Sequence, residues 1–404
     1  MPTSSAKPTT EYVLLVALLT SIGAMGTDIM LPALDVIGAE LGAPKPNDVH
    51  HLVITFFLGM GIGQLIVGPL SDSYGRKPVI YGGYAVFILG CILSMVTESW
   101  SVMLLARVLQ GLGAAAPRIV SVALVRDAYE GRAMARVMSI VMAAFITVPI
   151  LAPAVGQGLI AIGGWKSTFL ALAVMAVVAA LWFSARLPES LPVHKRRRFS
   201  LAVIWTGIVE ILRSRIALGY TIATGMIFGL FTGYLGSAQQ IFEITFDVGA
   251  LFPMYFAIAA ASIGAAALLN AVLIMRLGMR RLTWISLVGL TLLSFAFWAA
   301  LPLWSGTPPL MLFLAWQIGC FFCIGVIFGN FNALALEPLG HIAGLGAAFV
   351  GSIATFISLP LADLIGQAFD GTVTPLVAGF ALLSLAASAA MAWANRGAPP
   401  PDPA

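Results

Sequence analysis

The sequence predicts an all-α integral membrane protein with twelve transmembrane helices in two pseudo-symmetric six-helix bundles. Apolar residues make up 60% of the 404 residues and charged residues only 9%, whereas a soluble domain is about a quarter charged. The mean hydropathy is +0.99. Apolar runs of about 20 residues, the length at which a helix crosses a bilayer, recur along the whole chain.

Six of these runs lie in each half of the chain. Each run is continuously apolar rather than alternating, which predicts helices and not the strands of a membrane barrel. Short polar or Gly/Pro-containing segments separate the runs. The predicted spans are residues 12–33, 51–70, 79–97, 100–125, 135–162, 166–187, 216–238, 248–275, 282–301, 308–332, 344–366 and 373–395.

Basic residues in the short loops predict the orientation of these spans. A cytoplasmic N-terminus places seventeen of the 21 Lys and Arg residues on the cytoplasmic side, in agreement with the positive-inside rule. Both termini are therefore expected in the cytoplasm. The net charge of +4 follows from this pattern. The run HKRRRF at 194–199 is interpreted as a topology anchor beside anionic lipids and not as a nucleic-acid site.

The polar stretch LPESLPVHKRRRFS at 187–200 separates the two sets of six spans. Two such halves with a cavity at the membrane midplane are typical of transporters. A weak repeat supports duplication, because both halves place Gly and a basic pair before their third span. The predicted parts are a cytoplasmic N-terminus at 1–11, a bundle at 12–187, a cytoplasmic linker at 188–215, a bundle at 216–396 and a disordered tail at 397–404.

The stretch GPLSDSYGRKP at 68–78 gathers charges between the second and third spans. Gly68 allows close helix approach and Gly75 a tight turn. Asp72 can accept hydrogen bonds from a helix N-terminus or pair with a base across the two halves, while Arg76 and the following lysine are expected to stay in water. A topology-determining loop would need only the bases. The added acid favours a latch that controls a conformational change.

This stretch resembles the G-x-L-[AS]-D-x-x-G-R-[RK] signature of the major facilitator superfamily. LLARVLQGLGAAAP at 104–117 resembles the R-x-x-Q-G-x-G-A-A pattern of its drug/proton antiporters. VPILAPAVGQGLIAIGGW at 148–165 is similar to their G-P-x-x-G-G motif through Pro153, Gly156 and a displaced Gly158. Pro153 and Gly156 are expected to give a kinked, closely packing helix with a gating role. Ala152 and Gln157 depart from that motif.

Two further stretches, TDIMLPALDVIG at 27–38 and NALALEPLGHIAG at 332–344, look like the Bcr/CflA drug-resistance subfamily. The members of that subfamily export antibiotics such as chloramphenicol and bicyclomycin. The resemblance covers nearly the whole chain and implies the major facilitator fold and drug export.

Ionisable groups at membrane depth are few, and each costs at least about 2.5–3.5 kcal/mol to insert when charged. Asp28 in the first span and Arg107 in the fourth are expected at similar depths, so contact across the cavity is feasible. The resemblance implies the same pair, because related antiporters carry a membrane acid and the matching Arg there. We predict that this pair couples transport to protons; the alternative is a static ion pair. Asp363 in the eleventh span is the next candidate acid.

Aromatic and amide side chains in spans seven, eight and ten suit a mainly apolar pocket with few polar anchors. Arg118, on a similar helix face to Arg107, is expected to line the inner vestibule. Lipid-facing, packing, snorkelling or pairing roles are the alternatives for these residues. The predicted substrate-binding residues are Arg118, Phe228, Phe231, Tyr234, Tyr255, Asn270, Phe328 and Asn332, with Asn330 beside them.

The sequence therefore predicts a proton-coupled multidrug exporter of the bacterial inner membrane that works by alternating access. Its partners are a lipophilic small molecule, protons and lipids, without nucleic acid, and it is expected to act as a monomer. No phosphate-binding G-x-x-x-x-G-K-[ST] loop and no catalytic constellation occurs in the sequence, so an enzyme, a cofactor or a metal is not expected. The alternative is a proton-coupled transporter of a native metabolite, such as an amino acid, sugar or siderophore.

Overall fold

A computed structural model describes residues 9–196 and 198–396. Twelve helices in these ranges are long and apolar enough to cross a membrane, which confirms the predicted fold class. Helices suit these runs because backbone groups in a bilayer core must pair within their own segment. Residues 1–8 of the predicted N-terminal segment and the whole predicted tail at 397–404 lie outside the described residues.

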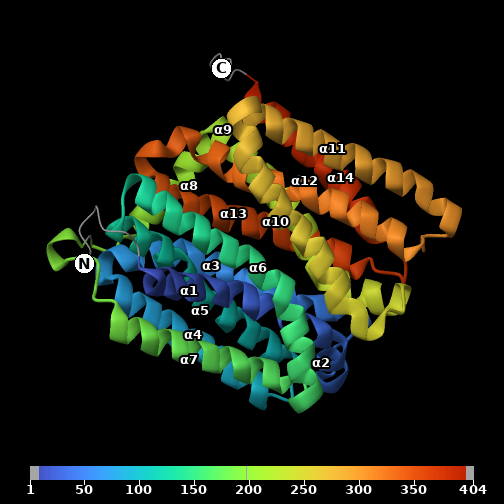
Figure 1. Cartoon of the computed structure of the whole chain (residues 1–404), viewed down its shortest axis with the longest axis horizontal. Helices are drawn as coiled ribbons and strands as arrows, with labels where there is room; N and C mark the ends of the chain where they lie inside the picture. Colours follow the sequence, from blue (N-terminus) through green and yellow to red (C-terminus); the bar gives the residue numbers. More distant parts are fainter. Residues whose placement is uncertain (1–8, 197, 397–404) are drawn as a thin grey trace. The chain divides into compact units, whose positions relative to one another are not determined.

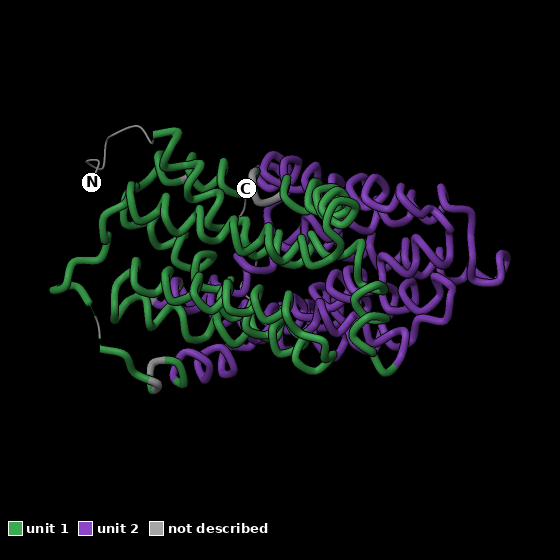
Figure 2. The backbone as a smooth tube through the Cα atoms, turned by 90° about the horizontal axis from the view of Figure 1, so that it is seen from below, with its two compact units in different colours: residues 1–44, 55–205 green, residues 45–54, 206–404 purple. Residues whose placement is uncertain are grey.

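The chain divides into two compact units, which Figure 2 colours separately. Unit 1 comprises residues 1–44 and 55–205, and unit 2 comprises residues 45–54 and 206–404. The segment 45–54 lies within the predicted first bundle in sequence, yet its contacts place it in unit 2.

Six spans belong mainly to unit 1, and α4 packs between α5 and α7 (Figure 1). The first span breaks after α1 and continues through the short helix η1 (Leu31–Ala33) into α2. The helices of this part of the chain are α1 (Thr10–Asp28), α2 (Leu34–Leu41), α3 (His51–Tyr74), α4 (Arg76–Val96), α5 (Trp100–Ala128), α6 (Gly131–Gly163) and α7 (Lys166–Arg186).

The other six spans form unit 2, in which α9 packs against both α13 and α14. A π-helical turn, η4 (Ile241–Thr245), extends α9. The helices of these spans are α9 (Arg215–Gln240), α10 (Phe252–Leu277), α11 (Met279–Ala300), α12 (Leu310–Leu336), α13 (Ala343–Gln367) and α14 (Thr374–Asn395). Shorter helices are η2 (Pro46–His50), η5 (Gly249–Leu251), η6 (Leu301–Trp304) and η7 (Glu337–Ile342).

The predicted linker at 188–215 contains a short helix, η3 (Val193–Lys195), and a longer one, α8 (Leu201–Arg213). At 1.5 Å per residue α8 is about 20 Å long, which is too short to cross a hydrocarbon core of about 30 Å. Ile211 is buried while Trp205 is exposed. The helix is therefore two-faced, as expected for a segment that lies along a surface.

Glycines let the backbones of α3 and α4 reach α5. A Cβ atom at Gly111 on α5 would lie 1.8 Å from the carbonyl oxygen of Phe56, and one at Gly59 on α3 would lie 1.9 Å from that of Val108. On α4, a Cβ at Gly83 would lie 2.8 Å from the carbonyl oxygen of Gly113. Small residues allow such close crossings between helices in membranes. Because the three helices pack this closely, polar side chains on α5 are buried between them.

Candidate functional site

Asp28 is the last residue of α1 and is only 4% exposed. The chain turns into η1 three residues later, where Pro32 lies in the first turn. A proline cannot continue the hydrogen-bond ladder of a preceding helix, which explains a break in the span at this point. The carboxyl group therefore lies at a helix end inside unit 1.

Arg107 is fully buried on α5. Its Nη1 donates a hydrogen bond to the carbonyl oxygen of Gly26, 2.9 Å away, and another to Gln110 Oε1. Gln110 in turn donates to Ser94 Oγ at 2.9 Å, and the guanidinium carbon lies 4.6 Å from the centre of the Phe56 ring. The charge is thus held by a carbonyl, an amide and an aromatic face, which are all good partners for a guanidinium.

The contact between the Asp28 and Arg107 side chains, which their positions in the sequence make feasible, is not found among the described residues. Among the salt bridges of the described residues there is none between these two side chains. Arg107 instead reaches the backbone of Gly26, two residues before Asp28. A Cβ at Gly26 would lie 3.1 Å from the Phe56 ring, so the glycine leaves room for that ring beside the guanidinium. Arg107 therefore anchors the helix that carries the acid.

The α6 helix approaches Asp28 from another side. A Cβ atom at Gly156 would lie 1.8 Å from the carbonyl oxygen of Ile29, the residue after Asp28. Pro149 and Pro153 lie inside the same helix, and Pro153 is buried. Of the two predicted gating residues of α6, Gly156 therefore contacts the backbone next to the buried acid.

Arg118 lies further along α5 and is half-buried. Its Nη1 lies 3.1 Å from the sulfur of Met60 on α3. Gly68, another predicted latch residue, is half-buried in α3 and directly precedes Pro69 inside that helix.

Arg76 is only 8% exposed, so the prediction that it stays in water was wrong. Its side chain lies 2.7 Å from Asp72 Oδ1 and 3.1 Å from Asp127 Oδ2, and it also donates to Ser71 Oγ at 2.6 Å. Asp127 lies at the end of α5. Two carboxylates and a hydroxyl replace the water that this guanidinium loses, and they join α3, α4 and α5 within unit 1.

Lys77 is also bound rather than free in water. Its Nζ donates to the carbonyl oxygen of Leu187 at 2.7 Å and to that of Ser184 at 3.3 Å. These carbonyls lie at the C-terminal end of α7, where the helix dipole favours a cation.

Glu189, which sequence reasoning did not single out, caps the N-terminus of α4. Its carboxylate accepts hydrogen bonds from the backbone N–H groups of Arg76 at 2.8 Å, Lys77 at 3.0 Å and Leu191 at 3.0 Å. Burial raises the pKa of Glu189, but these donors and the charge of Arg196 outweigh burial and hold the pKa below its usual value of 4.5. Glu189, and not Asp72, therefore accepts from this helix N-terminus.

The turn before α4 requires a glycine. Gly75 has φ of 103°, a value that residues with a Cβ rarely adopt. A Cβ at this position would also lie 2.7 Å from Glu189 Oε2. The predicted tight turn is present, and it makes room for the cap.

Three of the predicted substrate-binding aromatics form one cluster in unit 2. Phe228 and Phe231 on α9 and Phe328 on α12 have ring centres 6.1 to 6.4 Å apart. All three side chains are half-buried. They offer an apolar, partly accessible surface of a kind that suits a lipophilic ligand.

The other predicted ligand-contacting residues of unit 2 pack more tightly or lie apart. Tyr234 is fully buried against Phe321, with ring centres 4.8 Å apart, and Tyr255 is 9% exposed and stacks on Phe242. Asn270 and Asn330 exchange hydrogen bonds of 3.0 and 3.1 Å between α10 and α12. Asn332 is exposed and donates to the carbonyl of Phe328 in its own helix.

Replacing Gly156 by Ala is expected to lower the unfolding temperature of the purified protein. The new methyl group would collide with the carbonyl oxygen of Ile29, and such overpacking costs about 1–3 kcal/mol. Gly158→Ala is the matched control, because a Cβ at Gly158 would meet nothing within 4 Å. Thermal unfolding in detergent checks this. Equal unfolding temperatures for the two variants would contradict the close contact.

Glu189→Gln is expected to destabilise the protein at pH 7 by about 0.3–1 kcal/mol, the usual effect of a carboxylate at a helix N-terminus. A lowered pKa means that the folded state favours the ionised form, so the advantage exists above pH 4.5 and disappears as the pH falls through the lower folded-state pKa. Thermal unfolding at pH 7 and in acid measures it. Glu98→Gln, in the exposed turn between α4 and α5, is the control. A difference that persists unchanged in acid would rule out the electrostatic cap.

The sequence model described as the Major Facilitator Superfamily matches residues 16–359. The Bicyclomycin resistance protein homolog of Haemophilus influenzae is 27% identical over 385 residues, which cover 92% of each chain. Multidrug resistance protein D of Escherichia coli is 26% identical over 366 residues, which cover 88% of each chain. Both relatives lie in the Bcr/CflA drug-efflux branch, which confirms the resemblance found in the motifs.

A solved structure of a D-xylose-proton symporter has the same fold. It aligns with a TM-score of 0.77 over 94% of this chain and 96% of its own, at 13% identity, so the likeness concerns the fold alone. The matched sequence model covers most of the chain, including both Asp28 and the Arg76 cluster. The chain therefore belongs to the major facilitator superfamily.

Proposed function

We propose that this protein is a proton-coupled multidrug exporter of the bacterial inner membrane, with both termini in the cytoplasm. The relatives named as bicyclomycin and multidrug resistance proteins support drug export, and the Lys and Arg distribution supports the orientation. Alternating access would move the two six-helix units against each other and carry lipophilic molecules such as chloramphenicol- or bicyclomycin-like antibiotics outward.

The observation that carries the proton-coupling proposal is the buried carboxyl group of Asp28. Among the buried side chains described in unit 1, Asp28 is the one Asp or Glu. A carboxyl group in this setting changes its charge state when a neighbouring group or ligand approaches or leaves. We assign the transported proton to Asp28, and we assign to Arg107 the role of a positioning residue through Gly26.

The aromatic cluster of Phe228, Phe231 and Phe328 is the part of the proposed substrate site that the described contacts favour. Phenylalanine rings give apolar contact area without directional demands, which suits a binder of several lipophilic molecules. The Asp72–Arg76–Asp127 cluster is proposed as the latch, because its ion pairs join three helix ends that would have to shift during a conformational cycle.

Asp28→Asn is expected to abolish drug resistance while leaving the protein in the membrane. The test is the susceptibility of an efflux-deficient bacterium that expresses either the wild type or the variant, with a panel of antibiotics and metabolites. Wild type should raise the tolerated concentration of lipophilic drugs severalfold, and a protonophore should remove that gain. Immunoblots of membrane fractions control for expression.

Resistance that survives a protonophore would contradict proton coupling. Full resistance in Asp28→Asn would show that a residue other than Asp28 carries the transported proton. The metabolite transporter would be favoured by two results together. Expression of the wild type would leave the tolerance to every drug unchanged, and an amino acid, sugar or siderophore would stimulate proton movement in proteoliposomes.

A further inference from the structure

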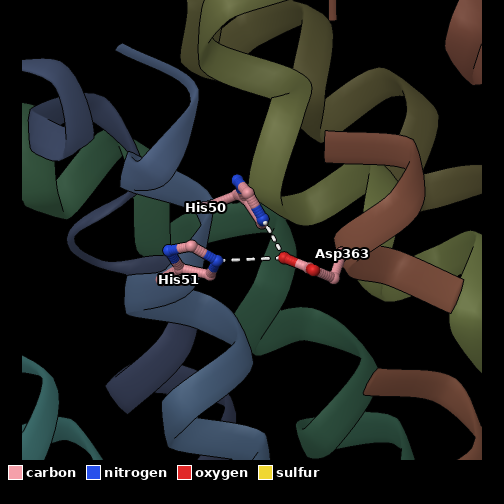
Figure 3. A group of neighbouring side chains, drawn as sticks. All are labelled: His50, His51 and Asp363. Carbon is pink, nitrogen blue, oxygen red and sulfur yellow. Dashed lines mark hydrogen bonds and ion pairs between the residues drawn. The ribbon is translucent and has the colours of Figure 1, made fainter. Parts of the chain in front are cut away.

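Two histidines and a carboxylate meet within unit 2 (Figure 3). His50 Nε2 lies 2.8 Å from Asp363 Oδ1, and His51 Nε2 lies 2.9 Å from the same oxygen. One ligand atom from each residue lies within 4.8 Å of the other two. His50 ends η2, His51 begins α3, and Asp363 lies near the end of α13. Segments more than 300 residues apart in sequence thus converge on one oxygen atom.

Polar contacts hold the histidine-bearing segment against the end of α13. Asn47 Nδ2 donates to the carbonyl oxygens of Gln367 at 3.0 Å and Phe369 at 2.8 Å. Gln367 Nε2 donates back to Asp48 Oδ1 at 2.7 Å. Three hydrogen bonds outside the cluster therefore hold the segment that carries His50 and His51 against this end of α13.

Two glycines fix the ring of His50, which is only 2% exposed. A Cβ at Gly236 on α9 would lie 2.8 Å from His50 Cβ, and one at Gly366 on α13 would lie 2.7 Å from His50 Cγ. Gly366 thus lies against the ring itself, and Gly236 lies against the Cβ atom that carries the ring. Such a preformed position is what a metal ligand needs.

The hydrogen-bond partners of His50 leave Nε2 facing an acceptor. Nδ1 contacts the carbonyl oxygen of Asn47, which can only accept, so Nδ1 carries the hydrogen. In a neutral imidazole Nε2 then holds a lone pair, yet it faces a carboxylate oxygen at 2.8 Å. Two acceptors at this distance need a proton between them, carried by the ring or by the carboxyl group, or a metal ion that binds both.

We propose that His50, His51 and Asp363 form a site for a divalent transition metal ion, with Zn²⁺ as the ion that best matches two imidazoles and one carboxylate. Three protein ligands of this kind with a water in the fourth position are typical of open zinc sites. The Asn47 carbonyl contacts Nδ1 of His50, as a carbonyl that orients a metal-binding imidazole does. Asp48 Oδ1 lies 3.8 Å from His51 Nδ1.

The site has an open side through which an ion and its water can enter. The side chain of Asp363 is 42% exposed and that of His51 is 29% exposed. A bound ion would fasten segment 45–54 to α13 more firmly than hydrogen bonds do. Metal binding at this site does not depend on which molecule the protein transports.

The test uses the full chain in detergent at pH 7.5, purified without a polyhistidine tag. Calorimetric titration with Zn²⁺ is expected to show one site per chain, and Co²⁺ should give the visible absorption of a tetrahedral site. Zn²⁺ should also raise the unfolding temperature, because it binds the folded form. His50→Ala and Asp363→Asn should each weaken binding at least tenfold, and binding should weaken at pH 5.5 as protons compete for the histidines.

His194→Ala is the matched control, because His194 is exposed in η3 of unit 1, and its loss should leave binding unchanged. His51→Gln is a second, milder variant for the case in which His50→Ala does not fold. Zn²⁺ binding that is equally strong in folded Asp363→Asn and His51→Gln would show an adventitious site and overturn the proposal. A wild type that binds no metal would overturn it as well.

Discussion

The burial of Arg107 is the constraint on which the arrangement of unit 1 depends. A guanidinium that is removed from water must find its partners inside the protein. Arg107 finds them on three other helices, in the carbonyl of Gly26 on α1, the ring of Phe56 on α3 and, through Gln110, Ser94 on α4. These contacts are possible because glycines bring α3 and α4 to backbone distance from α5. The same contacts fix the helix end at which Asp28 lies.

Charged groups also connect helices at the opposite ends of α3, α4 and α5. Arg76 joins Asp72 and Asp127, and Glu189 closes the N-terminus of α4. In a chain with 9% charged residues, these charged groups lie at helix ends, and Asp127 and Glu189 link elements that are distant in sequence. Links of this kind can be broken and remade as units, which is the property that a conformational cycle needs.

The fold could be predicted from the sequence because a continuous apolar run of about 20 residues satisfies its backbone hydrogen bonds in a bilayer by forming a helix. The positions of Asp28 and Arg107 within two of these runs could also be read from the sequence. The groups that contact the buried charges could not be predicted from the sequence. Arg107 binds a backbone carbonyl, which has no signature in a sequence, and Glu189 caps a helix that begins 113 residues earlier. Likewise, the adjacent histidines at 50 and 51 gave no hint of Asp363, because only tertiary packing brings α13 to them.

The role of Asp28 is tested most directly by proton release. A lipophilic drug that the protein exports is added to purified protein in weakly buffered detergent solution, and the pH change is recorded. Wild type is expected to release protons on drug binding, and Asp28→Asn to release none although it still binds the drug. Arg107→Lys keeps a donor for the Gly26 carbonyl and should release protons with reduced amplitude. Release from Asp28→Asn equal to that of the wild type would contradict the assignment of the transported proton to Asp28.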